Sequence, residues 1–474
     1  MKKFLLIAAL SSFVFSKTVD FKTVLKEALN NNLELKAKKL NIDKAEAKLK
    51  QAKGMDWGKF IFSEEISRTN NALYVFGMKL ESREATFRDF GFADFLSPLG
   101  SILADLAANN NAAAAQKLRG MGSLLDVEPK DLNYPGSRTN FKTKLVYELP
   151  IFTGFKITYA KKMAKLQVLA NKYKYSQDRN KLAVEVLKAY NGAVAAKYFI
   201  DALKKAKETT TAFINMVRAF YKEGMATESD LLQVEKRDAQ VSAMLIEAKN
   251  KYALALAYLR FLSDDNSISD VGDFEVIKFN NKSLDELKKI ALQNRGDLKW
   301  MRENVETMKA KVKFDKADKY PMIGAHFEYG WNDNTLTLSS DKDYYLVAAG
   351  MNWKVFDKSV DAKVEESKIG ALQTENYYRY MKKGIALEVE KAYLDYKAKR
   401  AIIKEKIKNK ELAEAILKKY EFMYKQGMIS MPILLMKEAD LRKARAELIK
   451  ARYDEAIAAA KLKEALGDLV KESK

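Results

Sequence analysis

One very long helix limits the folds that are open to this chain. From Ile157 to Tyr221 the sequence contains no proline, and Gly192 is its only strong helix breaker. At about 1.5 Å per residue, a helix of this length would extend for roughly 100 Å. A stripe of apolar residues follows one face of the helix, and its members are Ala183, Val186, Leu187, Tyr190 and Val194. Such a stripe is typical of a helix packed along its side, so we expect a coiled coil with similar rods.

The chain contains two tandem repeats. The segment YKEGM at 221–225 recurs as YKQGM at 424–428, 203 residues later, and the register continues without a gap through the residues that follow. A weaker match pairs Ala28-Leu29 with Ala291-Leu292, so each half is expected to open with a helix of its own. The first half is longer by about 60 residues. The repeats are expected to cover residues 17–270 and 271–474.

Each repeated segment reads as the tip of a helical hairpin. Gly224 ends the first helix, and Thr227 caps the next one, with Asp230 three residues later. Gly427 and Ser430 have the corresponding places in the second copy. The two glycines by themselves would fit ordinary turns equally well. We expect both tips at the same end of the molecule, at about 222–230 and about 425–433.

Before each long helix the hydrophobic period changes from that of a helix to that of a strand. Residues 322–332 alternate between an apolar set and a small or polar set that includes His326. Residues 345–355 and 141–151 alternate likewise, and a less regular strand lies near 59–68. We therefore expect one β-hairpin at about 57–152 and a second at about 322–356. The first hairpin would contain an insertion at about 81–139.

These strands are typical of a membrane barrel. Strands of about ten residues, with aromatic side chains on an apolar face and charges on the other, suit a barrel with lipid outside and water inside. A soluble two-layer sheet is the alternative. Because about eight strands are the practical minimum for a barrel, four strands require oligomerisation, and three copies would supply twelve. His326 would then face the lumen, and we do not expect it to bind a metal.

The first residues and the composition indicate an exported protein. MKKFLLIAALSSFVFS, residues 1–16, has the basic start, apolar run and small final residue of a signal peptide. No later segment has the roughly 20 apolar residues of a membrane-spanning helix. The chain has no cysteine, which excludes disulfides and thiol chemistry. We assign its net charge of +21 to solvated helix faces rather than to nucleic-acid binding, because export argues against nucleic acid as a partner.

In their order and spacing, several short motifs resemble the TolC family of outer-membrane efflux proteins. They are ALNNN at 28–32, LPIFTG at 149–154, WKVFD at 353–357 and the two tips. The resemblance implies a mainly α-helical homotrimer with a membrane β part. Its twelve-stranded outer-membrane barrel, four strands per chain, would continue into the periplasm as a coiled-coil barrel of long helices. It implies a passive exit duct whose partners are a periplasmic adaptor protein, an inner-membrane efflux pump or ABC transporter, and outer-membrane lipid.

The resemblance also implies where the chain meets its partners. The tip residues that would bind the adaptor are Gly224, Met225, Thr227, Asp230, Gly427, Met428 and Ser430. Well-known members of the family carry acidic rings beyond the second tip, where this chain has Ile433 and Met436. A closed periplasmic gate would therefore be apolar and would hold by packing and dewetting. The neighbouring Leu434 and Leu435 fit a coiled-coil core equally well.

The insertion has no assigned role in the sequence. Its phenylalanine-rich start precedes LADLAANNNAAAAQ within 86–131, and we expect it in an extracellular loop or over the barrel mouth, where it could plug, gate or decorate.

The sequence contains no phosphate-binding loop, nucleophile elbow or histidine-based metal motif, so we expect no enzyme activity and no cofactor. The alternative function is a periplasmic or secreted coiled-coil protein without a pore, which would explain the long helices but not the strands.

Overall fold

The structure is a computed structural model, and it describes residues 17–277, 279, 282–467 and 469–470. The expected signal peptide, residues 1–16, lies outside the described residues. Most of the described chain is helical. Among the helices of this part of the chain, none is at once long enough and apolar enough to cross a membrane.

The chain divides into two compact units. Among the described residues, the helical unit comprises 17–49, 162–310 and 367–470, and the sheet unit comprises Lys50–Lys161 and Lys311–Glu366. Each unit takes residues from both sequence halves. The two repeats are therefore interleaved in space, although they follow one another along the chain.

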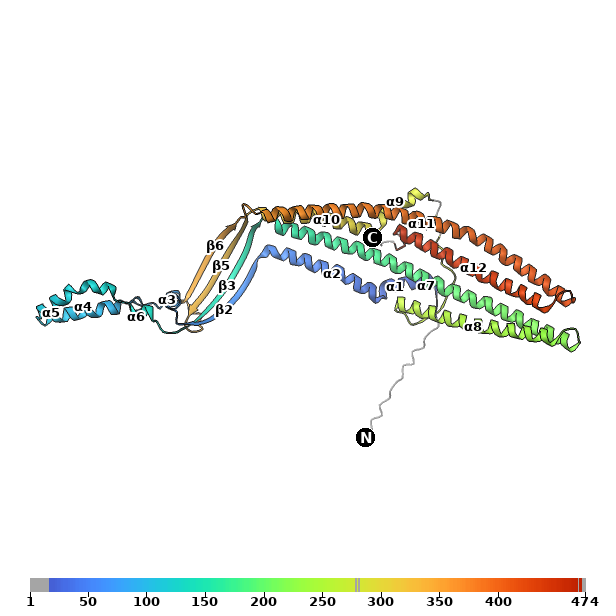
Figure 1. The fold of residues 1–474 in the computed structure, drawn as a ribbon, viewed down its shortest axis with the longest axis horizontal. Helices are drawn as coiled ribbons and strands as arrows, with labels where there is room; N and C mark the ends of the chain where they lie inside the picture. Colours follow the sequence, from blue (N-terminus) through green and yellow to red (C-terminus); the bar gives the residue numbers. More distant parts are fainter. Residues whose placement is uncertain (1–16, 278, 280–281, 468, 471–474) are drawn as a thin grey trace, which may run out of the picture. The chain divides into compact units, whose positions relative to one another are not determined.

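Long helical hairpins dominate the helical unit (Figure 1). The long helix expected from Ile157 to Tyr221 is confirmed, and the equivalent helix of the second half has nearly the same length. The helices that contribute to this unit are α1 (Phe21–Asn31), α2 (Leu33–Gly54), α7 (Lys156–Lys222), α8 (Glu228–Ser263), α9 (Leu284–Asn294), α10 (Gly296–Lys316), α11 (Lys358–Lys425) and α12 (Met431–Leu466).

The apolar stripe predicted on α7 lies in the core of the helical unit. Its five members are all buried, and all of them except Ala183 belong to one cluster with Phe21 and Val24 of α1 and Leu259 of α8. The prediction of lateral packing is therefore confirmed for this part of α7. Removing about 25 cal/mol per Å² of apolar surface from water is the main stabilisation that such a stripe provides.

A small parallel sheet, which the sequence did not predict, completes this core. It consists of β1 (Lys17–Val19) and β4 (Ile268–Val271). The Tyr190 hydroxyl donates to the Val19 carbonyl (3.3 Å), and the Tyr252 hydroxyl donates to the Asp270 carboxylate (2.5 Å). β4 lies across the boundary that the sequence placed between the repeats, at residues 270 and 271.

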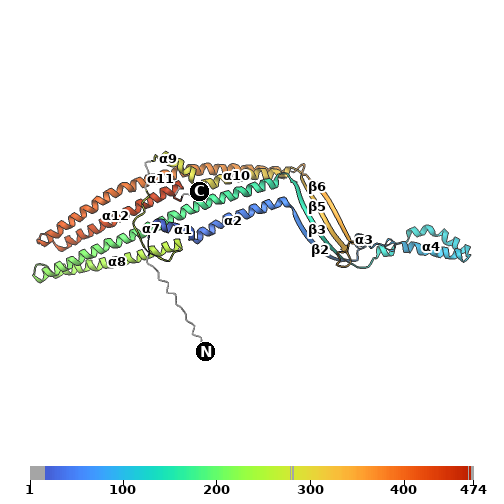
Figure 2. The ribbon, with the colours of Figure 1, turned by 180° about the vertical axis from the view of Figure 1, so that it is seen from behind.

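The sheet unit contains a four-stranded antiparallel sheet, and Figures 1 and 2 show its strands side by side. All four expected strands are present, and the order β2-β3-β5-β6 joins the two hairpins through β3 and β5. The bounds are β2 (Lys59–Thr69), β3 (Arg138–Thr153), β5 (Met322–Asp333) and β6 (Asp343–Asn352).

One strand is shorter than the sequence predicted. Alternation extends to Val355, but β6 ends at Asn352. Asn352 faces Met322, which is the first residue of β5. Residues beyond Asn352 therefore have no partner strand. Without a partner they form no inter-strand hydrogen bonds, so they are not part of the strand although their side chains alternate.

The insertion between β2 and β3 is largely helical, and the sequence reading assigned it no elements. Gly91 and Pro129, two residues within it, form a neck at the base of α4, because a Cβ built on Gly91 would lie 2.2 Å from the Pro129 Cβ. The Lys130 amide also donates to the Asp94 carboxylate (3.0 Å). The helices are α3 (Ala72–Glu81), α4 (Phe92–Ala107), α5 (Asn111–Arg119) and α6 (Lys130–Asn133), and the short 3-10 turns of the chain are Met55–Trp57, Phe87–Phe90, Met121–Asp126 and Ala317–Lys319.

Candidate functional site

The first helical tip has the caps that the sequence predicted. α7 ends at Lys222, and Gly224 follows with φ +72°, a left-handed conformation that glycine adopts without strain. Thr227 and Asp230 form a capping box: the Asp230 amide donates to the Thr227 hydroxyl (3.2 Å), and the Thr227 amide donates to the Asp230 carboxylate (3.1 Å). The tip is therefore a fixed turn rather than a loose loop.

The second tip repeats the turn but not the cap. Gly427 has φ +67°, and Ser430 is the residue before α12, yet its side chain makes no capping hydrogen bond. Pro432 stands at the second helical position and has no N–H, and an acidic residue equivalent to Asp230 is missing because Ile433 follows. The prediction of a matching cap at Ser430 is therefore wrong in this detail.

The two tips lie together at one end of the helical unit (Figures 1 and 2). The rings of Phe220 and Tyr424 stack with their centroids 6.2 Å apart, directly before the two turns. Behind them, Val217, Val234 and Leu434 are fully buried in one cluster. This packing leaves Met225 and Met428 exposed at the end of the unit.

The residues that the sequence assigned to a gate are partly exposed. Ile433 and Met436 are 37% and 49% exposed, whereas Leu434 and Leu435 are buried in the cluster beneath the tips. The reading of these two leucines as coiled-coil core is confirmed. Ile433 and Met436 belong to another face of α12.

A buried carboxylate near the tips was missed by sequence reasoning. Glu438 of α12 is 2% exposed, and its Oε1 and Oε2 lie 3.4 Å and 3.9 Å from the Nε atoms of Arg442 and Arg237. Burial raises the pKa of Glu438, and the two arginines partly offset this effect. Arg237 belongs to α8, so the ion cluster links the two hairpins. The repeat pairs Glu438 with Glu235, but burial was not visible in that match.

The four-stranded sheet has one apolar and one polar face, as the alternation predicted. The register places Phe60, Tyr147, Phe327 and Val347 in one row across the sheet. The adjacent row, on the opposite face, consists of Lys59, Glu148, His326 and Ala348. Much of the apolar face is exposed in the single chain. Within the described residues, β2 and β6 each pair with one strand only, so both edges of the sheet are open.

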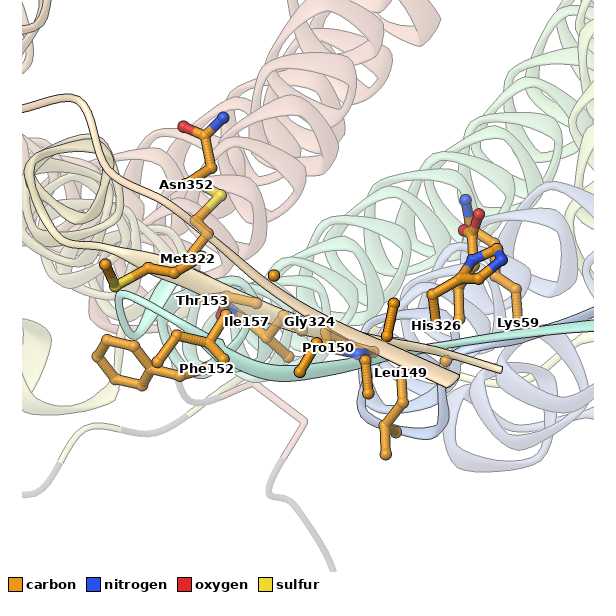
Figure 3. A pocket seen from close by; sticks show the side chains of 18 of the residues that line it. Lys59, Leu149, Pro150, Phe152, Thr153, Ile157, Met322, Gly324, His326 and Asn352 are labelled. Carbon is orange, nitrogen blue, oxygen red and sulfur yellow. The ribbon is translucent and has the colours of Figure 1, made fainter. Parts of the chain in front are cut away.

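An open hollow of about 820 Å³ lies at one end of the sheet, next to Ile157 in the first turn of α7, and Figure 3 shows its lining. Lys59 and His326 stand on one side of the strands in this view, and Leu149 points to the other. Small residues, including Gly324, Ala348 and Gly350, leave the space free. The His326 Nε2 lies 3.2 Å from the Glu328 carboxylate, and within the described residues no three acidic, histidine or cysteine side chains group as a metal site.

The polar face of the sheet is covered, at the end away from the hollow, by residues 71–90, which we call the strap. The Glu81 carboxylate accepts hydrogen bonds from Lys142 (3.3 Å) and from Asn332, which face each other on β3 and β5. The Arg83 guanidinium donates to the Asp341 and Asp343 carbonyls, at 2.9 and 2.7 Å. The strap therefore contacts both hairpins of the sheet.

Two basic side chains hold Glu84 of the strap. It accepts hydrogen bonds from Arg138 (2.5 Å) and Lys342 (2.9 Å). Burial alone would raise the pKa of Glu84, but the hydrogen bonds and charges of Lys342 and Arg138 outweigh it and lower the pKa to about 2. Asp89 has a pKa of about 2 for the same reason, with Lys79 and Thr86 as its partners.

A family model described as outer membrane efflux protein matches residues 107–263 and 287–468 of the chain. The alkaline protease secretion protein AprF of Pseudomonas aeruginosa is 24% identical over 194 residues. This match spans 40% of the chain and 40% of the length of AprF.

Solved outer-membrane channels have the same fold. The structure resembles CusC with a TM-score of 0.74 at 14% identity, over 95% of this chain and 92% of that one. It resembles the CmeC outer membrane channel of Campylobacter jejuni with a TM-score of 0.73 at 15% identity, over 96% and 87% of the two chains. For VceC of Vibrio cholerae the TM-score is 0.71 at 13% identity, over 94% and 96%. Because the family model covers more than half of the sequence, the chain is an outer-membrane protein that belongs to the outer membrane efflux protein family.

Proposed function

We propose that three copies of this chain form a passive exit channel of an efflux or secretion system, with a twelve-stranded barrel in the outer membrane. The observation that carries the proposal is the four-stranded sheet, whose apolar face is exposed and whose two edges are open. In lipid an unpaired backbone group costs several kcal/mol, so each edge needs a strand from another copy. The polar face, with Lys59, Glu148 and His326, would then line the lumen.

The foot of the sheet supports a membrane boundary at this level. The rings of Phe152, Phe155 and Tyr320 form a cluster, with centroids 5.3 Å and 6.1 Å apart, and the Trp353 indole donates to the Lys319 carbonyl (3.0 Å). Aromatic side chains of this kind are typical of membrane interfaces. Twelve lysines and five aspartates are the only charged residues in the segments around the foot, which are 53–59, 153–162, 311–320 and 353–363. Their net positive charge suits phospholipid headgroups.

We assign the helical tips to adaptor docking. Proteins of this family work with adaptor and inner-membrane pump components. The docking residues that we propose are Gly224, Met225, Thr227, Asp230, Gly427, Met428 and Ser430. The exposed methionines support this assignment because flexible thioether side chains suit an adaptable apolar contact. Cross-linking in the native host, followed by mass spectrometry, should recover an adaptor with the wild-type chain but not with the double variant Met225→Asp/Met428→Asp.

We further propose that Ile433 and Met436 line an apolar periplasmic gate. Their partial exposure, beside two buried leucines, supports a face of α12 that is free to meet other copies around an axis. In planar bilayers Ile433→Asp should increase conductance and cation selectivity, because a ring of carboxylates wets the constriction and attracts cations. Unchanged cation selectivity would remove Ile433 from the gate.

The test of the channel itself is conductance together with location. The purified protein should open steady single channels in planar bilayers and should sediment with outer membranes. A protein that sediments with no membrane and remains soluble without detergent would instead fit a periplasmic or secreted coiled-coil protein. The exposed apolar sheet face favours the channel. As part of the same proposal, residues 1–16 are the signal peptide, 17–270 and 271–474 are the two repeats, and the conduit has no catalytic activity of its own.

A further inference from the structure

Helix α4 of the insertion carries a regular apolar seam. Steps of four and three residues alternate along it, which is the spacing of the a and d positions of a coiled coil. Four of the five seam residues are 42–58% exposed, and the fifth, Leu99, is half-buried. The seam consists of Phe92, Leu96, Leu99, Leu103 and Leu106.

The seam is not the side of α4 that packs against α5. α4 and α5 form a small helical hairpin. Ile102, which is 3% exposed, and the fully buried Ala114 lie inside it. Lys117 of α5 forms an ion pair with Asp105 (2.7 Å). At 3.6 residues per turn, Ile102 is displaced around the helix by about a quarter of a turn from the centre of the seam, and Asp105 by more than about a third of a turn. The hairpin therefore uses one side of α4. Phe92, at the start of the seam, packs edge-on against Phe87 (ring centroids 5.4 Å), whereas Leu96, Leu103 and Leu106 remain exposed.

The chemistry of α4 favours a helix over a lipid surface as the occupant of the seam. Helices that lie on anionic membranes carry lysine and arginine on their polar face. α4 has neither, and its only charged residues are Asp94 and Asp105.

We propose that the seams of three copies pack together as a parallel three-helix coiled coil on the axis of the channel, beyond the strand ends where the insertion leaves the sheet. This inference rests on the proposed trimer. The neck at Gly91 and Pro129 joins every copy of α4 to its own sheet in the same direction, which makes the helices parallel. A seam of this length is marginal by itself, but attachment to one barrel gives it a high effective concentration. The coiled coil would narrow the outer end of the exit path.

The chain has no cysteine, so single-cysteine variants report on this packing without background. Leu103→Cys stands in the seam, and the matched control Ser97→Cys is exposed on another side of the same helix. In outer-membrane preparations treated with a short bis-maleimide, the Leu103→Cys chains should cross-link about tenfold more than the Ser97→Cys chains. Equal cross-linking of the two variants, in protein whose native mass is that of a trimer, would overturn the coiled coil but leave the channel intact.

A second pair of variants separates packing from mere proximity. Adding Leu96→Asp to Leu103→Cys places three carboxylates in the seam and should lower cross-linking by about tenfold, because like charges in a coiled-coil core repel. Adding Leu118→Asp, at an exposed site of α5, should leave cross-linking unchanged. Equal effects of the two aspartates would contradict the seam. A native mass without trimers would overturn this inference together with the proposed function.

Discussion

Equivalent glutamates of the two repeats have opposite environments. Glu438 is buried and faces the partly exposed side chains of Arg237 and Arg442, whereas the Glu235 side chain is 43% exposed and lies 3.3 Å from Arg218. A buried charge cluster depends on each of its members, because removing one leaves the others desolvated without a counter-ion. Exposed ion pairs contribute little.

The repeat provides its own control for this difference. Glu438→Gln should destabilise the packing between the two hairpins by about 2–4 kcal/mol, since two arginines lose their counter-ion. Glu235→Gln should cost less than about 0.5 kcal/mol. Hydrogen exchange of the backbone amides near the tips measures both effects. Similar protection in the two variants would show that Glu438 does not hold the hairpins together.

Glu84 gives the strap a defined response to pH. Its pKa is about 2 in the folded chain, against an ordinary value of 4.5. A lowered pKa means that the ion pairs stabilise the strap fully above about pH 4.5 and lose this effect as the pH falls towards 2. Glu84→Gln should remove the part of this pH dependence that comes from Glu84, leaving the part from Asp89, and should weaken the strap by about 1–3 kcal/mol at neutral pH. Trypsin cleavage at Arg88 should therefore be faster in Glu84→Gln, and unchanged in the exposed control Glu128→Gln.

At the scale of elements, the two tips predict unequal costs for equivalent substitutions. Thr227→Ala removes a capping box and should destabilise the first turn of α8 by about 1 kcal/mol. Ser430→Ala removes no capping bond and should have little effect on α12. Amide exchange in the first turn of each helix compares them. Equal losses would mean that Ser430 caps α12 in solution.

The elements differ in how far the sequence predicts them. The stripe on α7 and the alternation in β3 and β5 are long enough to identify a helix and two strands, and both are confirmed. β1 and β4 have three and four residues, too few for a period. In α4, Pro98 and Gly100 interrupt an otherwise regular pattern, so the helix was not predicted.

The same limit applies to the side chains of the candidate site. The Thr227–Asp230 cap was predictable because its residues are three positions apart. The partners of Glu84 are 54 and 258 positions away in the sequence, and no local pattern joins them. The burial of Glu438 depends on α8, a helix of the other half. Long-range pairs of this kind need the fold before they can be seen.

At the scale of the whole molecule, the single chain leaves too much apolar surface and too many backbone groups without partners. The apolar face of the sheet and the edges of β2 and β6 belong to this excess, as does the seam of α4. Lipid can cover the sheet face but cannot pair a strand edge. Because the chain has no cysteine, the copies of the proposed trimer would associate without disulfides. A closed ring of copies satisfies both requirements, with four strands from each.

The native mass of the protein extracted from outer membranes in detergent decides this account. We predict a single species with three times the mass of the mature chain, which remains trimeric on dilution and aggregates when the detergent is removed. A monodisperse single chain that stays folded and soluble without detergent would contradict the barrel and the exit channel built on it.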